Sequence, residues 1–252
     1  MPLAREDLIR MAESVGERSG WDFSSVRWRR DPTPWEYGDV ARRLLSPADR
    51  VLDVGTGGAE TFLRLSSYFG SGVGIDVSPE MVAHAQAHVV AAGIRNVQIS
   101  AMDAQHLDFE NAMFDVVLNR HCIIDVDETV RVLRSGGRFF TQQVGRRNAQ
   151  TILHAFGWTP DSFPDGWWQP IGPVSDAFAT AGCHVEAVAE YDVRYWFQDV
   201  PSLVFWLKSV PLPDTFDPAQ HWRTVNEIIE RHTTLHGIET NEHREMLIVR
   251  KR

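Results

Sequence analysis

The sequence predicts an α/β protein built on a doubly wound, mostly parallel sheet. Short apolar segments typical of buried strands alternate with helical segments between residues 51 and 144. A glycine-rich loop, in "VLDVGTGGAE", directly follows the first of these strands. With 252 residues, 43% of them apolar, the chain can bury the core of one such domain with a cap, or of two small domains.

The first half of the sheet is predicted from three segments. Residues 51–54 form a short buried strand, and a helix follows from about residue 59 to 69. "GVGIDV" is the second strand. The next helix, "SPEMVAHAQAHVVAAG", carries signals at both ends: Ser78 as N-cap, Pro79 at the first helical position and Gly93 beyond the last turn.

The remaining elements follow the same alternation. "NVQISAM" and "FDVVLN" are predicted as the third and fourth strands, "DETVRVLRSGG" as a short helix and "RFFTQQV" as the fifth strand. "CHVEAVAEYDV" and "REMLIVRKR" also have strand character, and residues 200–240 between them indicate helices interrupted by "PLPDTFDP". Before the first strand, residues 3–15 and 40–45 are predicted to be helical.

Charge and cysteine content restrict the class of partner. The formal net charge is -9, and the basic cluster of Arg27, Arg29 and Arg30 is too small to make a nucleic-acid surface. Cys122 and Cys183 are too few for a disulfide framework or a thiolate metal site. No apolar signal segment and no apolar run of about 20 residues is present, so we expect a cytoplasmic protein without a membrane partner.

The spacing of the glycine loop restricts its ligand. A dinucleotide fingerprint would place its third glycine at Glu60, whose carboxylate is a poor neighbour for a pyrophosphate. A P-loop is excluded because no Gly-Lys-Ser/Thr follows. The pattern that remains is D-x-G-x-G-G, in which Asp53 suits a ligand with a positive amine. The methionine part of S-adenosylmethionine offers such an amine.

Two further acidic positions agree with a nucleoside ligand. Asp76 ends the second strand 21 residues after Gly55 and can accept both ribose hydroxyls; the alternative is a helix cap or a solvated acid. Met102 and Asp103 end the third strand, where they can cover adenine and accept from its amine; the alternative is a plain surface turn.

In this order and spacing, "VLDVGTGGAE", "GIDVSPEMV", "MDAQHLDF" and "FDVVLNRHCI" resemble the first four motifs of the small-molecule class I S-adenosylmethionine-dependent methyltransferases. "VRVLRSGGRFFTQQV" resembles their "VLRPGG" strand entry, with Ser135 in place of the usual proline. The resemblance implies a Rossmann-like sheet of seven strands in the order 3-2-1-4-5-7-6, with strand 7 antiparallel. It also implies S-adenosylmethionine as cofactor and S-adenosylhomocysteine as product.

On these motifs the resemblance implies a set of cofactor contacts, with Asn119 contributing its backbone carbonyl and Arg120 its side chain. The set is Asp53, Gly55, Thr56, Gly57, Asp76, Val77, Met81, Met102, Asp103, Ala104, Asn119 and Arg120. No metal is expected, because His84 and His88 lie on a helix with no third ligand in view.

His121 is the candidate catalytic base, since it lies just past the carboxyl end of the fourth strand, where open α/β sheets bind ligands. A histidine titrates near pH 6.5 and can take a proton from a hydroxyl acceptor. The alternative is a histidine that bonds a backbone carbonyl in a tight loop.

The acceptor pocket is predicted from segments outside the core. Residues 1–46 are expected to form an N-terminal helical lid, and residues 47–252 the cofactor-binding domain with an acceptor-pocket insertion at about 195–240. Aromatic rings can enclose a flat, apolar acceptor, although core packing is the alternative for most of them. The candidate acceptor contacts are Trp28, Trp35, Tyr37, Gln143, Trp196 and Trp206.

The predicted function is methyl transfer to an oxygen or nitrogen of a small, aromatic or apolar metabolite. Two alternatives stay open: an enzyme of this fold that uses the sulfonium to drive cyclisation, and a non-catalytic partner that binds the cofactor. RNA methylation is disfavoured, because the chain lacks a basic surface and the N/D-P-P-Y/F motif. A homodimer is an option that the sequence leaves open.

Overall fold

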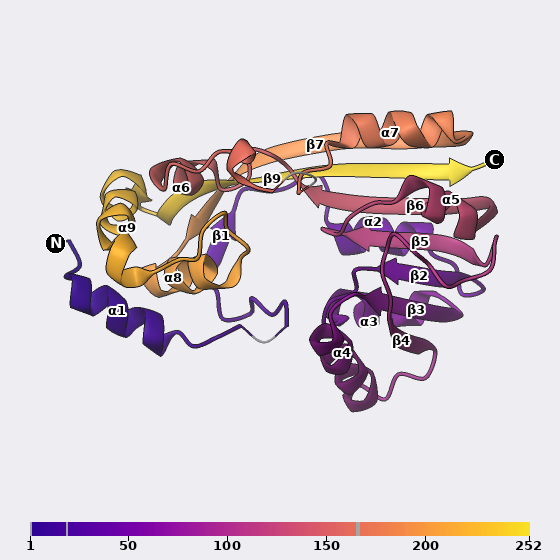
Figure 1. The fold of residues 1–252 in the computed structure, drawn as a ribbon, viewed down its shortest axis with the longest axis horizontal. Coiled ribbons are helices and arrows are strands. Elements are labelled where there is room, and N and C mark those ends of the chain that lie inside the picture. The colour runs from indigo at the N-terminus through magenta and orange to yellow at the C-terminus, as the bar shows by residue number, and fades with distance from the viewer. Residues whose placement is uncertain (1, 19, 165–166) are drawn as a thin grey trace. The chain divides into compact units, whose positions relative to one another are not determined.

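The computed structural model describes residues 2–18, 20–164 and 167–252 (Figure 1). The chain divides into two compact units. The first unit consists of Met1–Thr33, Arg146–Trp168 and Tyr191–His243. The second unit consists of Pro34–Gly145, Gln169–Glu190 and Arg244–Arg252.

Within the described residues the strands form one sheet in the order β1-β7-β9-β6-β5-β2-β3-β4, with β8 paired to β9. Their bounds are β1 (Trp28–Arg30), β2 (Arg50–Val54), β3 (Ser71–Asp76), β4 (Val97–Ala101), β5 (Phe114–Arg120), β6 (Leu133–Val144), β7 (Cys183–Phe197), β8 (Thr233–Thr234) and β9 (Gly237–Lys251). The pairs from β4 through β3, β2 and β5 to β6 are parallel (Figure 1). Strand β9 pairs antiparallel with β6.

The predicted strand order and the antiparallel last strand are confirmed, but the predicted count of seven is wrong. Nine strands lie in the described part of the chain, and the two extra ones, β1 and β8, have only three and two residues. Strand β1 lies in a proline-containing segment and forms by pairing with β7, Trp28 opposite Phe197. Strands this short carry too few residues for an alternating pattern, so pairing alone creates them.

The helices are α1 (Arg5–Ser14), α2 (Tyr37–Leu44), α3 (Glu60–Leu65), α4 (Pro79–Ala91), α5 (Val126–Val132), α6 (Gln150–Ala155), α7 (Ile171–Thr180), α8 (Val200–Ser209) and α9 (Pro218–His232), with 3-10 turns η1 (Ser66–Tyr68) and η2 (Pro160–Ser162). The predicted caps of α4 are confirmed: Ser78 Oγ accepts from the N–H of Met81 at 3.3 Å, and Gly93 adopts φ +64° just past the helix.

The second unit is packed on both faces of its sheet. Along β5, Val116 and Leu118 belong to one apolar cluster, whereas Val117 between them belongs to another. Neighbouring Val51 and Leu52 on β2 divide in the same way. Because side chains alternate along a strand, this division means that both faces are covered, as expected for a doubly wound sheet.

The first unit has an apolar core of its own. Leu8 of α1, Leu203 of α8 and Val225 of α9 are completely buried in the same cluster. Helix α1 packs against both α8 and α9, so the N-terminal segment and the segment near residues 200–240 share one interior. None of the helices among the described residues is both long and apolar enough to cross a membrane.

Candidate active site

The glycine loop between β2 and α3 is shaped by backbone conformations that favour glycine. Gly55 has φ +71° and Gly57 φ +56°, both in the left-handed region. A Cβ at Gly55 would also overlap the side chain of Cys122, which follows β5. Because β2 and β5 are parallel neighbours, their carboxyl ends meet here, and the two loops are in direct contact.

The carboxylate of Asp76, at the end of β3, is oriented by two backbone amides. Its Oδ2 accepts from the N–H of Gly57 at 2.9 Å, and its Oδ1 accepts from the N–H of Ser78 at 2.9 Å. An ionised carboxylate offers about four acceptor positions, so each oxygen can accept a further hydrogen bond. The arrangement therefore leaves room for the two hydroxyls of a ribose.

Asp53 is the buried acid below the glycine loop, with 8% of its surface exposed. Burial raises the pKa of Asp53 to about 7, although the Arg120 guanidinium favours the charged form. Arg120, at the end of β5, donates to Thr61 Oγ1 at 3.0 Å. A buried carboxyl with a near-neutral pKa is stabilised in its charged form by a cation beside it, so this acid suits an ammonium group.

On the other side of Asp76, the loop after β4 carries Met102 and Asp103. The N–H of Met102 donates to the carbonyl of Asp76 at 3.0 Å, which connects the ends of the two strands. Asp103 is exposed, and its Oδ1 accepts from the N–H of Gln105 at 2.9 Å. An apolar side chain thus lies next to a carboxylate at the sheet edge, an arrangement that suits an adenine ring.

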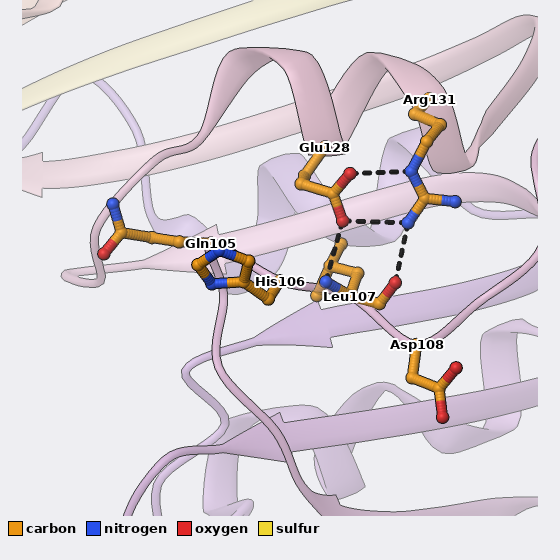
Figure 2. Close-up of a pocket in the computed structure, with 6 residues that line it drawn as sticks. All are labelled: Gln105, His106, Leu107, Asp108, Glu128 and Arg131. Atoms are coloured by element: carbon orange, nitrogen blue, oxygen red, sulfur yellow. Dashed lines mark hydrogen bonds and ion pairs between the residues drawn. The ribbon is translucent and has the colours of Figure 1, made fainter.

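The ion pair of Glu128 and Arg131 on α5 fixes the next residues of this loop. Figure 2 shows both side chains beside Leu107, in the lining of a hollow that also includes His106. Arg131 Nη2 donates to the carbonyl of Leu107 at 2.7 Å, and Glu128 Oε2 accepts from the N–H of Leu107 at 2.7 Å. Hydrogen bonding from Arg131 lowers the pKa of Glu128 below its ordinary value. Charge-assisted bonds to backbone groups fix the course of the loop.

The turn after β5 is held by a buried amide. Asn119 is 1% exposed; its Nδ2 donates to the carbonyl of Ile123 at 3.0 Å, and its Oδ1 accepts from Gln143 Nε2 at 2.8 Å. Gln143 Nε2 also lies 3.0 Å from the carbonyl oxygen of Cys122. The Gln143 amide nitrogen therefore donates inside the turn.

His121 lies in this turn with φ +58°, a strained conformation for a residue with a side chain. Its Nε2 lies 3.5 Å from Gln142 Nε2, and Gln142 Oε1 accepts from the indole N–H of Trp35 at 3.1 Å. Since the oxygen of Gln142 serves Trp35, its amide nitrogen is the donor to the imidazole, whose Nε2 is the acceptor. His121 is partly open to solvent, but the protein atoms around its ring remove much of the water that would stabilise a charge. This desolvation, and next the positive charges of Arg244 and Arg120, lowers the pKa of His121 well below its ordinary value, so the ring is neutral at pH 7.

With this geometry in place, comparison with known proteins identifies the domain. Residues 51–138 match the family model described as "Methyltransferase domain". The chain carries a class I S-adenosylmethionine-dependent methyltransferase domain. The matched segment begins at β2, includes the loops with Asp76, Asp103 and His121, and ends within β6.

Relatives of this methyltransferase domain act on dissimilar molecules. The arsenite methyltransferase of Halobacterium salinarum is 30% identical over 139 residues, which are 50% of this chain and 35% of that protein. The aklanonic acid methyltransferase DauC of a Streptomyces species is 33% identical over 133 residues, which are 46% of this chain and 60% of that protein. The chain thus spans less than two thirds of the length of the curated relatives it matches.

Solved structures show the same fold over more of the chain. The structure of YcgJ from Bacillus subtilis has a TM-score of 0.61 at 19% identity and covers 85% of this chain and 97% of its own. The structure of the 4+2 cyclase SpnF has a TM-score of 0.59 at 17% identity and covers 99% of this chain and 97% of its own.

The cofactor of this methyltransferase domain is S-adenosylmethionine, and the residues present fit it. The left-handed glycines allow close approach to the loop, the buried Asp53 suits the amino group, and the pre-oriented Asp76 suits the ribose. The other predicted contacts border these residues: Thr56 and Ala104 are half-buried, Met81 lies in the first turn of α4, and Val77 is 73% exposed between Asp76 and the α4 cap.

The predicted acceptor contacts fall in both units. Trp35, Tyr37 and Gln143 lie in the methyltransferase unit, whereas Trp28, Trp196 and Trp206 lie in the other. Among the latter, Trp28 is exposed and stacks on Tyr195 with ring centroids 5.8 Å apart. Trp196 is 1% exposed, and its N–H donates to Glu239 Oε2 at 2.8 Å. Trp206 is half-buried beside Phe197. Their binding roles stay predictions.

Sequence reasoning considered both Gln142 and Gln143 and chose Gln143 as the acceptor contact, whereas Gln142 is the residue that connects His121 to Trp35. Alternation along β6 indicated that only one of Gln142 and Gln143 would face the site. The choice between them depends on the register of β6 against β5, in which Gln142 lies opposite Arg120. No local pattern in the sequence carries that register.

Proposed function

We propose that this chain transfers the methyl group of S-adenosylmethionine to an oxygen or nitrogen atom of a small, aromatic or apolar metabolite. The observation that carries the proposal is the row of hydrogen bonds from Trp35 through Gln142 to His121, next to the turn that contacts the glycine loop. It supports the proposal because an imidazole that could act as a base and an indole ring lie together beside the predicted cofactor contacts.

The residues of the methyltransferase domain mainly orient the two reactants. When bound, the cofactor supplies a methyl group already activated on a sulfonium. Asp53 takes its amino group, Asp76 takes its ribose hydroxyls, and Met102 with Asp103 takes its adenine. Fixing two reactants in line is worth effective molarities of about 10⁵–10⁸ M.

We propose His121 as the base toward an acceptor hydroxyl, whose O–H would take the place of the long, 3.5 Å contact with Gln142 at Nε2, the acceptor nitrogen of the neutral ring. Its lowered pKa keeps the imidazole neutral, and therefore able to accept a proton, at and below pH 7. Because the lowered pKa makes this imidazole a weak base, it would assist only a comparatively acidic hydroxyl, so we propose a phenol rather than an aliphatic alcohol as the acceptor. An uncharged amine acceptor would need no base.

The acceptor is enclosed by aromatic residues outside the core of the methyltransferase domain. Within the methyltransferase unit, the predicted acceptor contact Trp35 is held in place by Gln142. We propose residues 1–46 as the lid and the segment at about 195–240 as the wall of the acceptor pocket. Flat rings bind flat apolar molecules with little loss of side-chain freedom.

A second candidate is an enzyme that holds the same cofactor and cyclises its ligand without methylating it. The observation that favours it is the fold similarity to the 4+2 cyclase SpnF over 99% of the chain. In that case His121 would polarise the ligand rather than accept a proton from an attacking hydroxyl.

The deciding experiment incubates the protein with methyl-labelled S-adenosylmethionine and a panel of phenols, anilines and apolar alcohols, and records product mass and regiochemistry. A labelled product with equimolar S-adenosylhomocysteine supports methyl transfer. Rearranged product of unchanged mass, formed without S-adenosylhomocysteine, supports cyclisation and contradicts the first proposal.

The base is tested with His121→Ala and a phenolic substrate from that panel. Because general-base catalysis contributes typically about 10²–10⁴-fold, we expect a loss of turnover of that order. The affinity for S-adenosylhomocysteine, measured by calorimetry, should change little. Full turnover in the variant at every pH would remove His121 from the reaction.

A further inference from the structure

Tyr37, at the start of α2, combines a well-packed ring with an unpaired hydroxyl. The residue is 6% exposed, and its ring stacks on Phe140 with centroids 4.8 Å apart and an interplanar angle of 21°. Its hydroxyl oxygen is buried and has no hydrogen-bond partner among the described residues. Buried tyrosine hydroxyls normally find a partner, so an unpaired one calls for an explanation.

Tyr37 belongs to an apolar cluster, but two charged side chains also act on it. The guanidinium carbon of Arg120 lies 5.6 Å from the centroid of the Tyr37 ring. Burial, and next the carboxyl group of Asp53, raises the pKa of Tyr37 well above its ordinary value. The phenol is therefore protonated at physiological pH and offers its O–H as a donor.

The neighbours indicate which group the donor meets. Asp53 is the acid proposed for the ammonium of the cofactor's methionine tail, and Arg120, of opposite charge, is among the predicted cofactor contacts. The same tail also carries a carboxylate. The ammonium group has only donors, so it suits Asp53, whereas the carboxylate suits a guanidinium and an O–H donor. Tyr37 adjoins this pair of charges and is not among the hydrogen-bond partners of Gln142 and His121.

We infer that the Tyr37 hydroxyl donates a hydrogen bond to the carboxylate of the methionine tail, together with Arg120. Tyr37 therefore belongs with the cofactor contacts rather than with the acceptor contacts among which its position in the sequence placed it. The inference deepens the proposed function and rests on its cofactor site.

The test compares two ligands that differ only in the tail. S-adenosylhomocysteine carries the amino acid, and 5′-methylthioadenosine is the same nucleoside without it. Calorimetry on the ligand-free protein measures both affinities for the natural chain and for Tyr37→Phe, which keeps the ring on Phe140. We expect the variant to bind S-adenosylhomocysteine about 10-fold or more weakly, as for a lost hydrogen bond to a charged group, and 5′-methylthioadenosine unchanged.

Thermal unfolding of the free variant provides a second measurement. Because the hydroxyl has no partner among the described residues of the free protein, Tyr37→Phe should keep the Tm or raise it. The matched control is Tyr68→Phe, which removes the hydroxyl of an exposed tyrosine in η1 and should change neither affinity. A lowered Tm in Tyr37→Phe would mean that the hydroxyl is bonded within the protein, against the inference.

Three binding outcomes would overturn the assignment. If the natural chain and Tyr37→Phe bind S-adenosylhomocysteine with equal affinity, the inferred hydrogen bond from Tyr37 does not form, and the proposed function is unaffected. If Tyr37→Phe loses the same affinity for both ligands, the hydroxyl acts on the nucleoside that the two ligands share and not on the tail. Failure of the natural chain to bind either ligand would instead remove the cofactor site, and the proposed function with it.

Discussion

The two units differ in whether a buried acid has an ion-pair partner among the described residues. In the first unit, Glu242 is 9% exposed, forms an ion pair with Arg30 and accepts the Tyr191 hydroxyl at 2.6 Å. In the methyltransferase unit, Asp53 is 8% exposed, and the guanidinium of Arg120 does not keep its pKa from rising to about 7. Two acids of similar burial are thus paired with a cation in one unit and left with a raised pKa in the other.

The histidines show the same contrast. His243 in the first unit is 1% exposed and accepts from the backbone N–H of Arg147 at 3.1 Å. His121 is exposed, has a left-handed backbone and bonds through its ring to the side chain of Gln142. Polar groups that are satisfied within the protein support a fold, whereas strained or under-satisfied ones collect where a ligand is bound.

The largest expected effect is a loss of stability when the paired acid of the first unit, Glu242, is replaced. Glu242→Gln removes the charge that pairs with Arg30, whose side chain is only 17% exposed, and so takes an ion-pair partner from a largely buried cation. We expect the free energy of unfolding to fall by about 3–5 kcal/mol, as for other broken buried pairs. Chemical denaturation at pH 7 measures it. A fall of less than about 1 kcal/mol would mean that the pair is not structural.

The second effect is a loss of cofactor affinity when Asp76, the acid that accepts from two backbone amides, is replaced. Asp76→Ala removes the acceptor of the ribose hydroxyls, and we expect affinity for S-adenosylhomocysteine to fall about 100-fold or more, since each hydrogen bond to a charged group is worth about 1.5–3 kcal/mol. Calorimetry measures the affinity, and circular dichroism checks that the fold is retained. The ribose assignment fails if the affinity is unchanged.

The smallest effect on stability, and the most specific in its pH dependence, concerns Asp53. Its pKa is about 7 in the folded protein against 3.8 as the ordinary value, so the folded state holds the proton more tightly. The stability contribution of the protonated acid is fully present below about pH 4 and is lost as the pH rises to 7 and above. Asp53→Asn should therefore raise the free energy of unfolding at pH 8 by about 1–3 kcal/mol, and hardly at pH 4.

The same variant checks the ligand role. Binding an ammonium needs the charged carboxylate, so affinity for S-adenosylhomocysteine should rise from pH 6 to pH 8 in the natural chain and lose that dependence in Asp53→Asn. Identical unfolding curves of the two proteins at pH 8 would show that Asp53 is not strained, and the contrast with Glu242 would disappear.

Much of the methyltransferase domain could be predicted because its signals are local. Ser78 and Pro79 start a helix through contacts within four residues, and Gly55 and Gly57 mark a turn through their own backbone freedom. Asp76 was predicted from its place at the end of a strand, and the parallel sheet brings it to Gly57. The strand order followed from the family resemblance, and pairing confirms it.

The sequence by itself determined the α/β class and predicted the acids at the carboxyl edge of the sheet, because each depends on residues close together in the chain. Only the tertiary structure decided the two short strands, the contact of Gln142 with His121 and the unpaired hydroxyl of Tyr37. These depend on which residues of distant segments come into contact, which is a property of register and packing. A sequence pattern can show that a residue is buried, whereas only the folded chain shows whether it finds a partner there.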